Sequence, residues 1–448
     1  MNAKNETIME QNEEKVDNDI EVTEDQLNND KLAKLKAKMA QKQDVPDTKP
    51  QQKKKSIRLG VIGSGQAGSN LAAQMFKLGY DAVAINTAQQ DLEYIEMPDQ
   101  NKLLLEYGLG GAGKELDIGF AAADAYRESI NDLVRKRIGD AQLLLFCTSL
   151  GGGSGAGSAE VIVDILALLG KPIVVMTVLP MSTDDAQTKH NALVTLSKFA
   201  KMAQGRKIDN LIVVDNARIE SIYSDVGSLN FFKVANQAIV EPIDVFNTLS
   251  SMPSSIKGLD PTEFAKVMTD GQGLTIYGSM TVSNYEEETA IAEAVIDNLS
   301  GSLLASGFDL KKARYVGAMF VANEKTWAKI PNSSVNYAMS MINDVCGSPL
   351  GLFKGIYSVD SDDDVIKVYS IFSGLGLPDD RVEQLKNDAK EKMAQSNVKD
   401  EQRNLALKLD TGTEETVSAA EAIKKRITAK KSSFGKIHSN AVIDRRKK

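Results

Sequence analysis

Short apolar runs alternate with longer stretches of helical spacing from about residue 56 onward. The runs that we predict to be strands are Ile57–Ile62, Ala82–Ile85, Lys102–Leu105, Gln142–Cys147, Ile173–Val178 and Asn210–Val214. This alternation is typical of a doubly wound parallel sheet with helices on both faces. Residues 56–228 are therefore predicted to form one α/β domain.

A long helix is predicted next, over Leu229–Ser250, because apolar residues recur there at helical spacing. Beyond it, strand-like runs alternate again with helical stretches such as Glu286–Leu303. These runs are Leu274–Val282, Arg314–Val321 and Asp364–Phe372. We therefore expect a central helix at 229–250, a second and smaller α/β domain at 251–378, and a helix after Pro378 that leads into a tail at 379–448.

The two ends of the chain differ in composition from its middle. Residues 1–55 are rich in Glu, Asp, Lys, Asn and Gln and poor in large apolar residues, which predicts a disordered extension, with a short solvated helix at Asp30–Gln43. The other end is basic, with ten Lys and Arg residues against the single acid Asp444. These residues are Lys424, Lys425, Arg426, Lys430, Lys431, Lys436, Arg445, Arg446, Lys447 and Lys448. Such a tail is either merely solvated or a binding segment.

The composition of the chain argues against several classes of functional site. The chain has 448 residues, a formal net charge of −8, two cysteines and two histidines, so disulfide frameworks, the usual nitrogen and sulfur metal sites and serine-histidine triads have little to be built from. The net negative charge argues against nonspecific nucleic-acid binding by the whole surface. There is neither an apolar run of membrane-spanning length nor a secretory signal, so we expect a cytoplasmic protein.

Three glycine-rich loops follow predicted strands. The first, Gly63–Asn70, fits G-x-G-x-x-G, which by itself leaves a dinucleotide-binding unit of an NAD-dependent enzyme open. The next strand ends at Asn86-Thr87 rather than at an acid, and Asp91 is expected in the following helix. Two further loops, Gly108–Lys114 and Gly151–Gly157, should converge with the first at one edge of the sheet and surround a phosphate chain.

The third loop, Gly-Gly-Gly-Ser-Gly-Ala-Gly at 151–157, is similar to the G-G-G-[ST]-G-[SAT]-G signature of the tubulin/FtsZ superfamily. Gly65-Gln66-Ala67-Gly68 resembles the first phosphate loop of eukaryotic tubulins, and Ala84-Ile85-Asn86-Thr87 resembles the strand end of FtsZ. The resemblance runs from about residue 57 to residue 378. It implies a GTP-binding domain at 56–228 and an activation domain at 251–378. It further implies GTP or GDP with Mg²⁺ as ligands and head-to-tail polymerisation, with GTP hydrolysis at the joint between subunits.

The resemblance also implies nucleotide contacts along the chain. The residues are Gly65, Gln66, Ala67, Gly68, Asn70, Asn86, Thr87, Gly110, Gly111, Ala112, Gly113, Lys114, Gly151, Gly152, Gly153, Ser154, Gly155, Ala156, Gly157, Pro180, Asp184, Asn216, Phe232 and Asn236. Asn216 and Asn236 would read guanine, since an amide both donates and accepts. Phe232 would either stack on the base or belong to the core. The sugar loop departs from FtsZ, which has a glutamate near Asp184 and an arginine near Thr188 or Lys189. No protein side chain is expected to bind the metal directly.

The segment Gly258–Phe264 resembles the D-x-T-E-F activating loop of α-tubulin. By this resemblance Glu263 is the main catalytic candidate and Asp260 its partner, acting on the nucleotide of the next subunit. A carboxylate there would orient or deprotonate the attacking water. The alternative is local, because Asp260, Pro261 and Glu263 also have the spacing of a helix capping box.

Within the superfamily, Gly111–Glu115 lacks the Asn-Pro of FtsZ and looks more like the plasmid and phage tubulins of the TubZ type. We therefore expect a filament that positions plasmid or phage DNA or particles, with a basic tail that binds a DNA–adaptor complex or braces neighbouring subunits. The alternatives are an FtsZ-like ring protein of cell division and a nucleotide-binding scaffold with little hydrolysis. An NAD-dependent enzyme is the least favoured interpretation.

Overall fold

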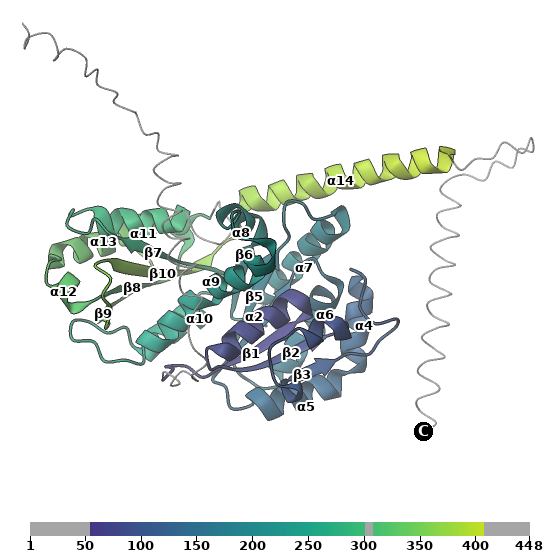
Figure 1. The fold of residues 1–448 in the computed structure, drawn as a ribbon, viewed down its shortest axis with the longest axis horizontal. Coiled ribbons are helices and arrows are strands. Elements are labelled where there is room, and N and C mark those ends of the chain that lie inside the picture. Colours follow the sequence, from purple (N-terminus) through teal and green to yellow (C-terminus); the bar gives the residue numbers. More distant parts are fainter. Residues whose placement is uncertain (1–53, 301–307, 407–448) are drawn as a thin grey trace, which may run out of the picture. The chain divides into compact units, whose positions relative to one another are not determined.

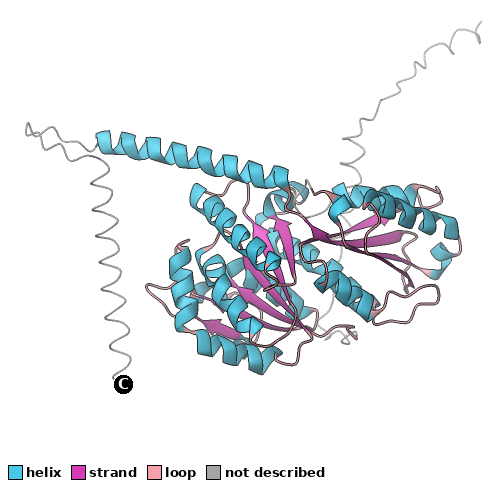
Figure 2. Cartoon of the chain, turned by 180° about the vertical axis from the view of Figure 1, so that it is seen from behind, coloured by secondary structure: helices cyan, strands magenta, loops and turns pink. Residues whose placement is uncertain are grey.

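The computed structural model describes residues 54–300 and 308–406. The predicted extension, its helix at Asp30–Gln43 and the basic residues of the tail lie outside these ranges. Within them, ten strands form one mixed sheet in the order β3-β2-β1-β4-β5-β6-β7-β10-β8-β9 (Figures 1 and 2). The strands are β1 (Leu59–Ser64), β2 (Asp81–Asn86), β3 (Lys102–Leu104), β4 (Leu143–Ser149), β5 (Ile173–Leu179), β6 (Asn210–Asp215), β7 (Leu274–Val282), β8 (Tyr315–Ala322), β9 (Gly351–Ser358) and β10 (Ile366–Leu375).

Helices cover both faces of the sheet (Figure 2). They are α2 (Gly65–Lys77), α3 (Gln89–Glu93), α4 (Leu116–Ala125), α5 (Arg127–Ile138), α6 (Gly153–Ala167), α7 (Ala186–Gln204), α8 (Asn216–Ile222), α9 (Ser228–Leu249), α10 (Pro261–Thr269), α11 (Ala290–Ser300), α12 (Glu324–Trp327), α13 (Asn332–Val345) and α14 (Asp379–Ala406). Short 3₁₀ turns lie at Asp99–Asn101 and Leu310–Lys312. The α/β class with a parallel sheet is thus confirmed for the first six strands, which pair in parallel.

The two halves of the chain share the sheet. β7 pairs in parallel with β6 through Leu211 opposite Leu274 and Ile212 opposite Thr275. It then pairs antiparallel with β10, which pairs antiparallel with β8. The central helix runs from Ser228 to Leu249, one residue off the predicted start and end. Its buried stripe includes Ala235, Ile239 and Ile243, at the helical spacing on which the prediction was based.

Strand β9 was not predicted. Its sequence, Gly-Leu-Phe-Lys-Gly-Ile-Tyr-Ser, is interrupted by glycine and lysine, and only its second half is buried. Parallel pairing along the whole of β8 supplies the order that the local sequence lacks. The helix expected at Glu286–Leu303 is also shorter at its start, since α11 begins at Ala290.

Helix α2 begins at Gly65, within the segment Gly63–Asn70 that we expected to be a loop. Much of the first glycine segment is therefore helix rather than loop. Close packing explains why it contains glycine: a Cβ at Gly68 would lie 2.2 Å from the Cys147 carbonyl oxygen of β4. In α6, a Cβ at Gly157 would lie 2.4 Å from the Leu116 carbonyl oxygen. These glycines let α2 approach the sheet and let α4 approach α6.

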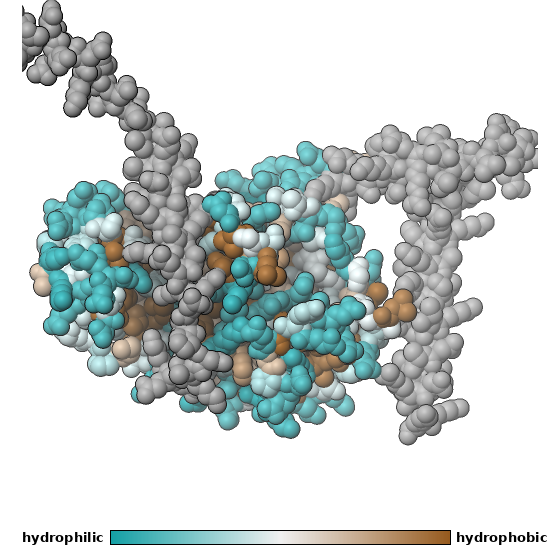
Figure 3. Space-filling view, in the orientation of Figure 1, coloured by the Kyte–Doolittle hydropathy of each residue, from teal (hydrophilic) through white to brown (hydrophobic). Residues whose placement is uncertain are grey.

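None of the helices in the described part of the chain is long and apolar enough to cross a membrane. The face shown in Figure 3 is largely hydrophilic, with separate hydrophobic patches. The apolar residues gather instead in the sheet, where every residue of β1 and β5 is buried.

Strand β1 lies between β2 and β4, so the strand order reverses direction at this point of the sheet. In open α/β sheets, ligands bind in the crevice beyond the carboxyl ends of strands at such a switch point. The segments that follow β1, β2, β3, β4, β5 and β6 all leave from this edge, and a cavity lies there.

Candidate functional site

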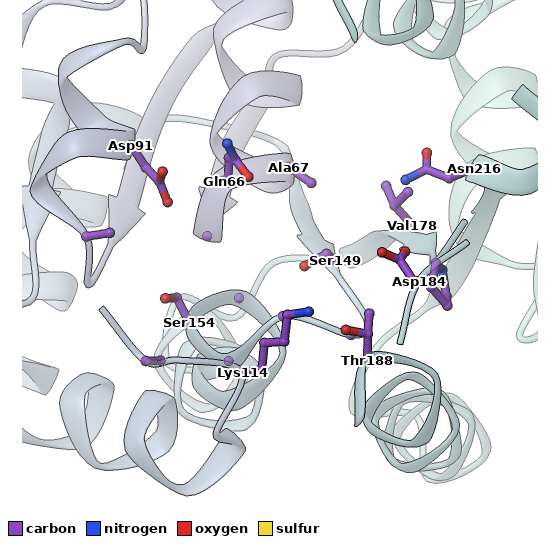
Figure 4. A pocket seen from close by; sticks show the side chains of 18 of the residues that line it. Gln66, Ala67, Asp91, Lys114, Ser149, Ser154, Val178, Asp184, Thr188 and Asn216 are labelled. Carbon is purple, nitrogen blue, oxygen red and sulfur yellow. The ribbon is translucent and has the colours of Figure 1, made fainter. Parts of the chain in front are cut away.

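A cavity of about 420 Å³ lies at the carboxyl ends of the central parallel strands (Figure 4). Its lining comprises Gly65, Gln66, Ala67, Ala88, Asp91, Gly111, Ala112, Gly113, Lys114, Ser149, Gly151, Gly152, Gly153, Ser154, Gly155, Val178, Leu179, Pro180, Met181, Asp184, Thr188, Asn216 and Phe232. In Figure 4, Gln66 and Asp91 lie on one side of the cavity and Asn216 and Asp184 on another, with Lys114 and Ser154 below. Segments from six different βα connections, together with Phe232 of α9, therefore meet at one site.

Among the helix starts that line this cavity, those of α2 and α6 lie in two of the glycine segments. α2 starts at Gly65 and α6 at Gly153, and residues of both first turns line it. Neither helix has a side-chain cap or an acidic residue in its first turn. The backbone N–H groups of a first turn have no partner within the helix, and the helix dipole makes this end positive. The two starts together form a site for an anion.

The second glycine segment completes this half of the cavity. Gly110, Gly111 and Gly113 have φ values of 85°, 97° and 54°, in the region that glycine adopts without strain. Lys114 is the exception, since it has a side chain and a φ of 64°. Its carbonyl oxygen accepts a bond of 2.7 Å from the Asn191 side chain, which holds the strained backbone in place.

The Lys114 side chain forms an ion pair with Asp185, the N-cap of α7. Partial burial raises the pKa of Asp185, but the hydrogen bonds donated by Lys114 and by Thr188 outweigh it and lower the pKa to about 2. Asp185 is therefore an anion at neutral pH. Its charge holds the ammonium group of Lys114, which lines the cavity.

Polar side chains behind the glycine segments fix the wall of the cavity. The hydroxyl groups of Thr87 and Ser154 lie 2.5 Å apart. The Asn86 side chain accepts from the Thr87 N–H at 2.8 Å and donates to Asp91 at 3.0 Å. Asn86 thus orients Asp91, which lines the cavity from α3.

The opposite half of the cavity is built from side chains. Asn216 is the first residue of α8, and Asp215 caps that helix by accepting from the Ala217 N–H at 3.2 Å. Phe232 of α9 is 56% exposed and lines the cavity, so it does not belong to the core. Asp184 accepts from the Met181 N–H at 2.8 Å, which closes the loop after β5.

Most of the predicted binding residues meet at this one cavity. Those that do not line it are Gly68, Asn70, Asn86, Thr87, Gly110, Ala156, Gly157 and Asn236. Asn70 donates to the Gln66 carbonyl oxygen within α2. Asn236 is half-buried on α9. A direct contact between any of these residues and a nucleotide stays a prediction.

Seven lining residues were not predicted: Ala88, Asp91, Ser149, Val178, Leu179, Met181 and Thr188. Ser149, Val178 and Leu179 are at the ends of β4 and β5. A rule that every parallel strand of this sheet ends at the site would have found them. Asp91 was expected in the helix that follows the second strand, and it does lie in α3.

Asp260 and Glu263 do not line this cavity. Asp260 is the N-cap of α10 and accepts from the N–H groups of Thr262 at 2.7 Å and Glu263 at 2.9 Å. The Glu263 side chain accepts from the Asp260 N–H at 3.1 Å, so both bonds of a capping box are formed. The local alternative is therefore present in the structure. Asp260 is nevertheless exposed and Glu263 partly so, which leaves both carboxylates at the surface.

A nucleoside di- or triphosphate fits this arrangement. The two uncapped helix starts and Lys114 would hold its phosphates, and the Asn216 amide would meet its base. No group of three or more His, Cys, Asp or Glu suited to a metal occurs among the described residues. Mg²⁺ bound with a nucleotide would take most of its oxygen ligands from phosphate and water, with Asp91 and Ser154 as the nearby protein oxygens. Its chemistry there would be to offset phosphate charge.

Comparison with known families agrees with this geometry. Residues 58–224 match the Tubulin/FtsZ family, GTPase domain, and residues 245–386 match the C-terminal domain of the Tubulin/FtsZ-like protein TubZ-like family. The chain is 30% identical over 256 residues to the cell division protein FtsZ 2 of Haloferax volcanii. That match covers 55% of this chain and 59% of the relative, so the chain spans about three fifths of the relative's length.

Two solved structures share the fold. A GTPγS-form protofilament of TubZ from Bacillus thuringiensis serovar israelensis aligns with a TM-score of 0.69 and 19% identity, covering 80% of this chain and 96% of that chain. A structure described as type III plasmid segregation TubZ aligns with a TM-score of 0.65 and 18% identity, covering 77% of this chain and 95% of that chain. The two family matches, the sheet order and the cavity agree, and the chain belongs to the tubulin/FtsZ family, with a GTPase domain followed by a TubZ-like C-terminal domain.

Proposed function

We propose that the protein binds GTP and GDP in this cavity, assembles head to tail and hydrolyses GTP where one subunit meets the next. The observation that carries the proposal is the pair of uncapped helix starts at Gly65 and Gly153, which face one cavity. α7, α8 and α10 begin with an aspartate cap, and α3, which also starts uncapped at this cavity, has Asp91 in its first turn. A missing cap at two convergent helices is supplied by the phosphates of a nucleotide.

In this proposal, different residues of the cavity bind the phosphates and the base. The first turns of α2 and α6 bind the phosphates through backbone N–H groups, and Lys114 places a positive charge beside them. Asn216 accepts and donates hydrogen bonds to guanine, and Phe232 packs on the ring. Bound Mg²⁺ offsets the charge on the phosphates.

Hydrolysis in this proposal needs a second subunit. Glu263 is the candidate catalytic residue that orients or deprotonates water, with Asp260 as its partner. Both lie on a surface outside the cavity of their own subunit. Carboxylates that are displayed at the start of a helix can reach the cavity of a neighbour but not their own, so turnover would depend on assembly.

Exposed apolar side chains support self-association. Leu109, beside the cavity loop, is 89% exposed and Leu229, at the start of α9, is 96% exposed. Met252 and Ile256, shortly before Asp260, are 45% and 54% exposed. Apolar residues thus lie both near the cavity and near the candidate catalytic carboxylates, as two complementary ends of a subunit require.

For the biological process we propose the positioning of plasmid or phage DNA or particles. The match of residues 245–386 to the TubZ-like C-terminal domain supports this assignment over an FtsZ-like division ring. The basic residues of the tail would bind DNA or a DNA-bound adaptor by charge. The match of residues 58–224 to a GTPase domain leaves no support for an NAD-dependent enzyme.

A second candidate is a nucleotide-binding scaffold with little hydrolysis. The completed capping box favours it, because Asp260 and Glu263 already have a structural role. The two candidates differ in whether Glu263 is needed as a base or only as a cap. Glutamine caps a helix as glutamate does but cannot take a proton, so Glu263→Gln separates them.

The decisive experiment measures phosphate release from GTP across a series of protein concentrations, with light scattering in parallel. We expect one threshold concentration for both signals. Glu263→Gln should assemble at the same threshold, with turnover reduced about 100-fold or more, the usual size of a general-base contribution.

Glu324→Gln is the matched control, because Glu324 is an exposed glutamate in the first turn of α12. It should leave both signals unchanged. Turnover that does not depend on concentration would contradict hydrolysis between subunits. Full turnover in Glu263→Gln would remove the catalytic role of Glu263, and assembly without turnover in the wild type would establish the scaffold.

A further inference from the structure

A buried ion pair joins the first turn of α14 to the base side of the cavity, by which we mean the start of α8 with Asn216 and the loop after β5. Arg381 Nε lies 2.7 Å from Asp215 Oδ2, and Arg381 Nη2 lies 3.0 Å from Asp215 Oδ1. The two side chains are only 7% and 5% exposed. A planar guanidinium that makes two parallel bonds fixes a carboxylate in both position and orientation.

Asp215 in turn fixes the position of Asn216. It is the last residue of β6 and the N-cap of α8, and the next residue, Asn216, faces the cavity. If the Asp215 carboxylate turns away, the start of α8 loses its cap and the Asn216 amide loses its direction. Arg381 therefore acts on the cavity through one intermediate residue.

A second ion pair, in which the lysine is buried and the aspartate is 31% exposed, joins α14 to α7 and through it to the loop after β5. Lys189 Nζ of α7 lies 2.8 Å from Asp388 Oδ2 of α14 and also donates to the Ser182 carbonyl oxygen at 2.8 Å. The Lys189 side chain is 2% exposed. Ser182 belongs to the loop that supplies Pro180, Met181 and Asp184 to the cavity lining. Both base-side segments thus depend on α14.

The two charged residues of α14 lie on one face of the helix. Arg381 and Asp388 are seven residues apart, which is two helical turns. Leu385 and Ala389 lie on the same face and are 0% and 5% exposed. This face packs against α7 (Figure 1). Burial of Leu385 and Ala389, together with the two ion pairs, favours one docked position of α14.

We propose that Arg381 and Asp388 are positioning residues for guanine recognition, and that docking of α14 and binding of the nucleotide base are thermodynamically coupled. The inference rests on the proposed function of the cavity. If α14 detaches, Asp215 and Lys189 are left buried without their partners, so the two segments must rearrange. By linkage, a base that fixes those segments also strengthens the docking of α14. The helix that leads into the basic tail then responds to nucleotide binding.

The test measures binding of GDP and ADP to the full chain by titration calorimetry, below the concentration at which it assembles. Arg381→Gln should weaken GDP binding about tenfold or more, while ADP binding, which is carried by the phosphates, changes little. The ratio of the two affinities is the readout, because a general loss of stability would lower both affinities equally. Arg381→Lys keeps the charge but loses the bidentate pair of hydrogen bonds to Asp215. Its ratio of GDP to ADP affinity should therefore lie between those of the wild type and Arg381→Gln.

Asp388→Asn breaks the second ion pair at a partly exposed position, and it stands in if Arg381→Gln fails to fold. It should also lower the GDP to ADP ratio. The matched controls are Lys386→Gln and Asp380→Asn, which make the same charge changes at exposed positions of α14 and should leave the ratio unchanged. Hydrogen exchange of residues 379–390 should slow when GDP is added to the wild type and not when it is added to Arg381→Gln.

The outcomes separate this inference from the proposed function. If the wild type does not bind GDP, the proposed function fails and the inference fails with it. If the wild type binds GDP, and Arg381→Gln and Asp388→Asn keep the wild-type ratio of GDP to ADP affinity, the coupling is refuted while the cavity remains a nucleotide site. A lowered ratio in both variants with unchanged controls establishes the coupling.

Discussion

The two halves of the cavity are built in different ways. The half that we assign to phosphates consists of glycine backbone at the first turns of α2 and α6 and in the segment before Lys114. The half that we assign to the base consists of side chains, and its two segments are held from α14 by Arg381 and Asp388. Within each segment of the first half, the binding groups are the backbone of residues close together in the chain. The other depends on contacts across 166 and 199 residues.

This difference separates two ways to make a binding surface. Backbone N–H groups at a helix start are placed as soon as the helix forms, provided that no side chain blocks the approach. An amide that reads a base must instead be oriented by its neighbours, and these neighbours come from wherever the fold brings them. We therefore expect substitutions in the phosphate half to weaken binding through steric clash. Substitutions that affect the base half should weaken binding by leaving a buried charge without its partner.

The largest effect on stability is expected at the base half. Arg381→Gln leaves the Asp215 carboxylate buried without its ionic partner, which should lower the free energy of unfolding by about 3–5 kcal/mol. Glu160→Gln, which breaks the exposed pair with Lys198, should cost less than about 1 kcal/mol. Urea unfolding measures both. Equal losses would show that the Arg381 pair is no more than a surface contact.

A smaller loss of stability, with a large loss of binding, is expected at the phosphate half. In Gly155→Ala the added Cβ would lie 2.6 Å from Thr148 Oγ1 and 2.7 Å from the Ser64 carbonyl oxygen. Overpacking of this kind costs about 1–3 kcal/mol of unfolding free energy. The displaced first turn of α6 should also weaken GDP binding about tenfold or more, because a hydrogen bond to a charged group contributes about 1.5–3 kcal/mol.

Gly227→Ala is the control, because a Cβ at Gly227 would meet nothing within 4 Å. Because Gly227 is the N-cap of α9, where alanine is disfavoured, the substitution should lower the free energy of unfolding by no more than about 1 kcal/mol. Wild-type GDP affinity in Gly155→Ala would mean that the N-terminus of α6 does not hold the phosphates.

A third effect, of about 1 kcal/mol, is expected outside the cavity and tests whether the candidate catalytic segment is ordered locally. Glu263→Ala removes one bond of the capping box and should lower the free energy of unfolding by about 0.5–2 kcal/mol. Glu263→Gln keeps that bond and should be close to wild type. Thermal unfolding of both variants measures the difference. A matching loss in Glu263→Gln would show that charge at the helix start, rather than the cap, stabilises α10.

The smallest effect is expected at the ion pair between Lys114 and Asp185. Asp185→Asn keeps the helix cap and loses the ion pair, and both charged side chains are about half exposed, at 51% and 50%. The loss should therefore be under about 1 kcal/mol at neutral pH and smaller still at high salt.

The pH dependence follows from the lowered pKa of Asp185. Its folded-state pKa of about 2 lies below the ordinary value, so the stabilisation is fully present above about pH 4 and is lost as the pH falls toward 2. The difference in melting temperature between wild type and Asp185→Asn should shrink over that interval. A difference that stays constant down to pH 2 would contradict the pair.

Much of the fold was open to prediction because its signals are local. The six parallel strands, the central helix and β7 are apolar runs or periodic stretches, and except in the short β3 most of their apolar residues are buried. β9 was missed because its glycines and lysine give no strand pattern and its order comes from pairing with β8. The start of α2 was misplaced because glycines that indicate a loop in isolation are tolerated in a helix that must approach a strand closely.

The candidate site divides along the same line. The sequence by itself determined the three glycine segments and the position of Asn216 at a strand end, since strand, turn and helix start are consecutive in the chain. Only the tertiary structure decided that Asp91 and Ser149 face the same cavity, and that Arg381 and Lys189 hold its base side. The sequence does not show which residue will pair with a charge that becomes buried. The free energy that favours one partner arises only when folding removes both side chains from water.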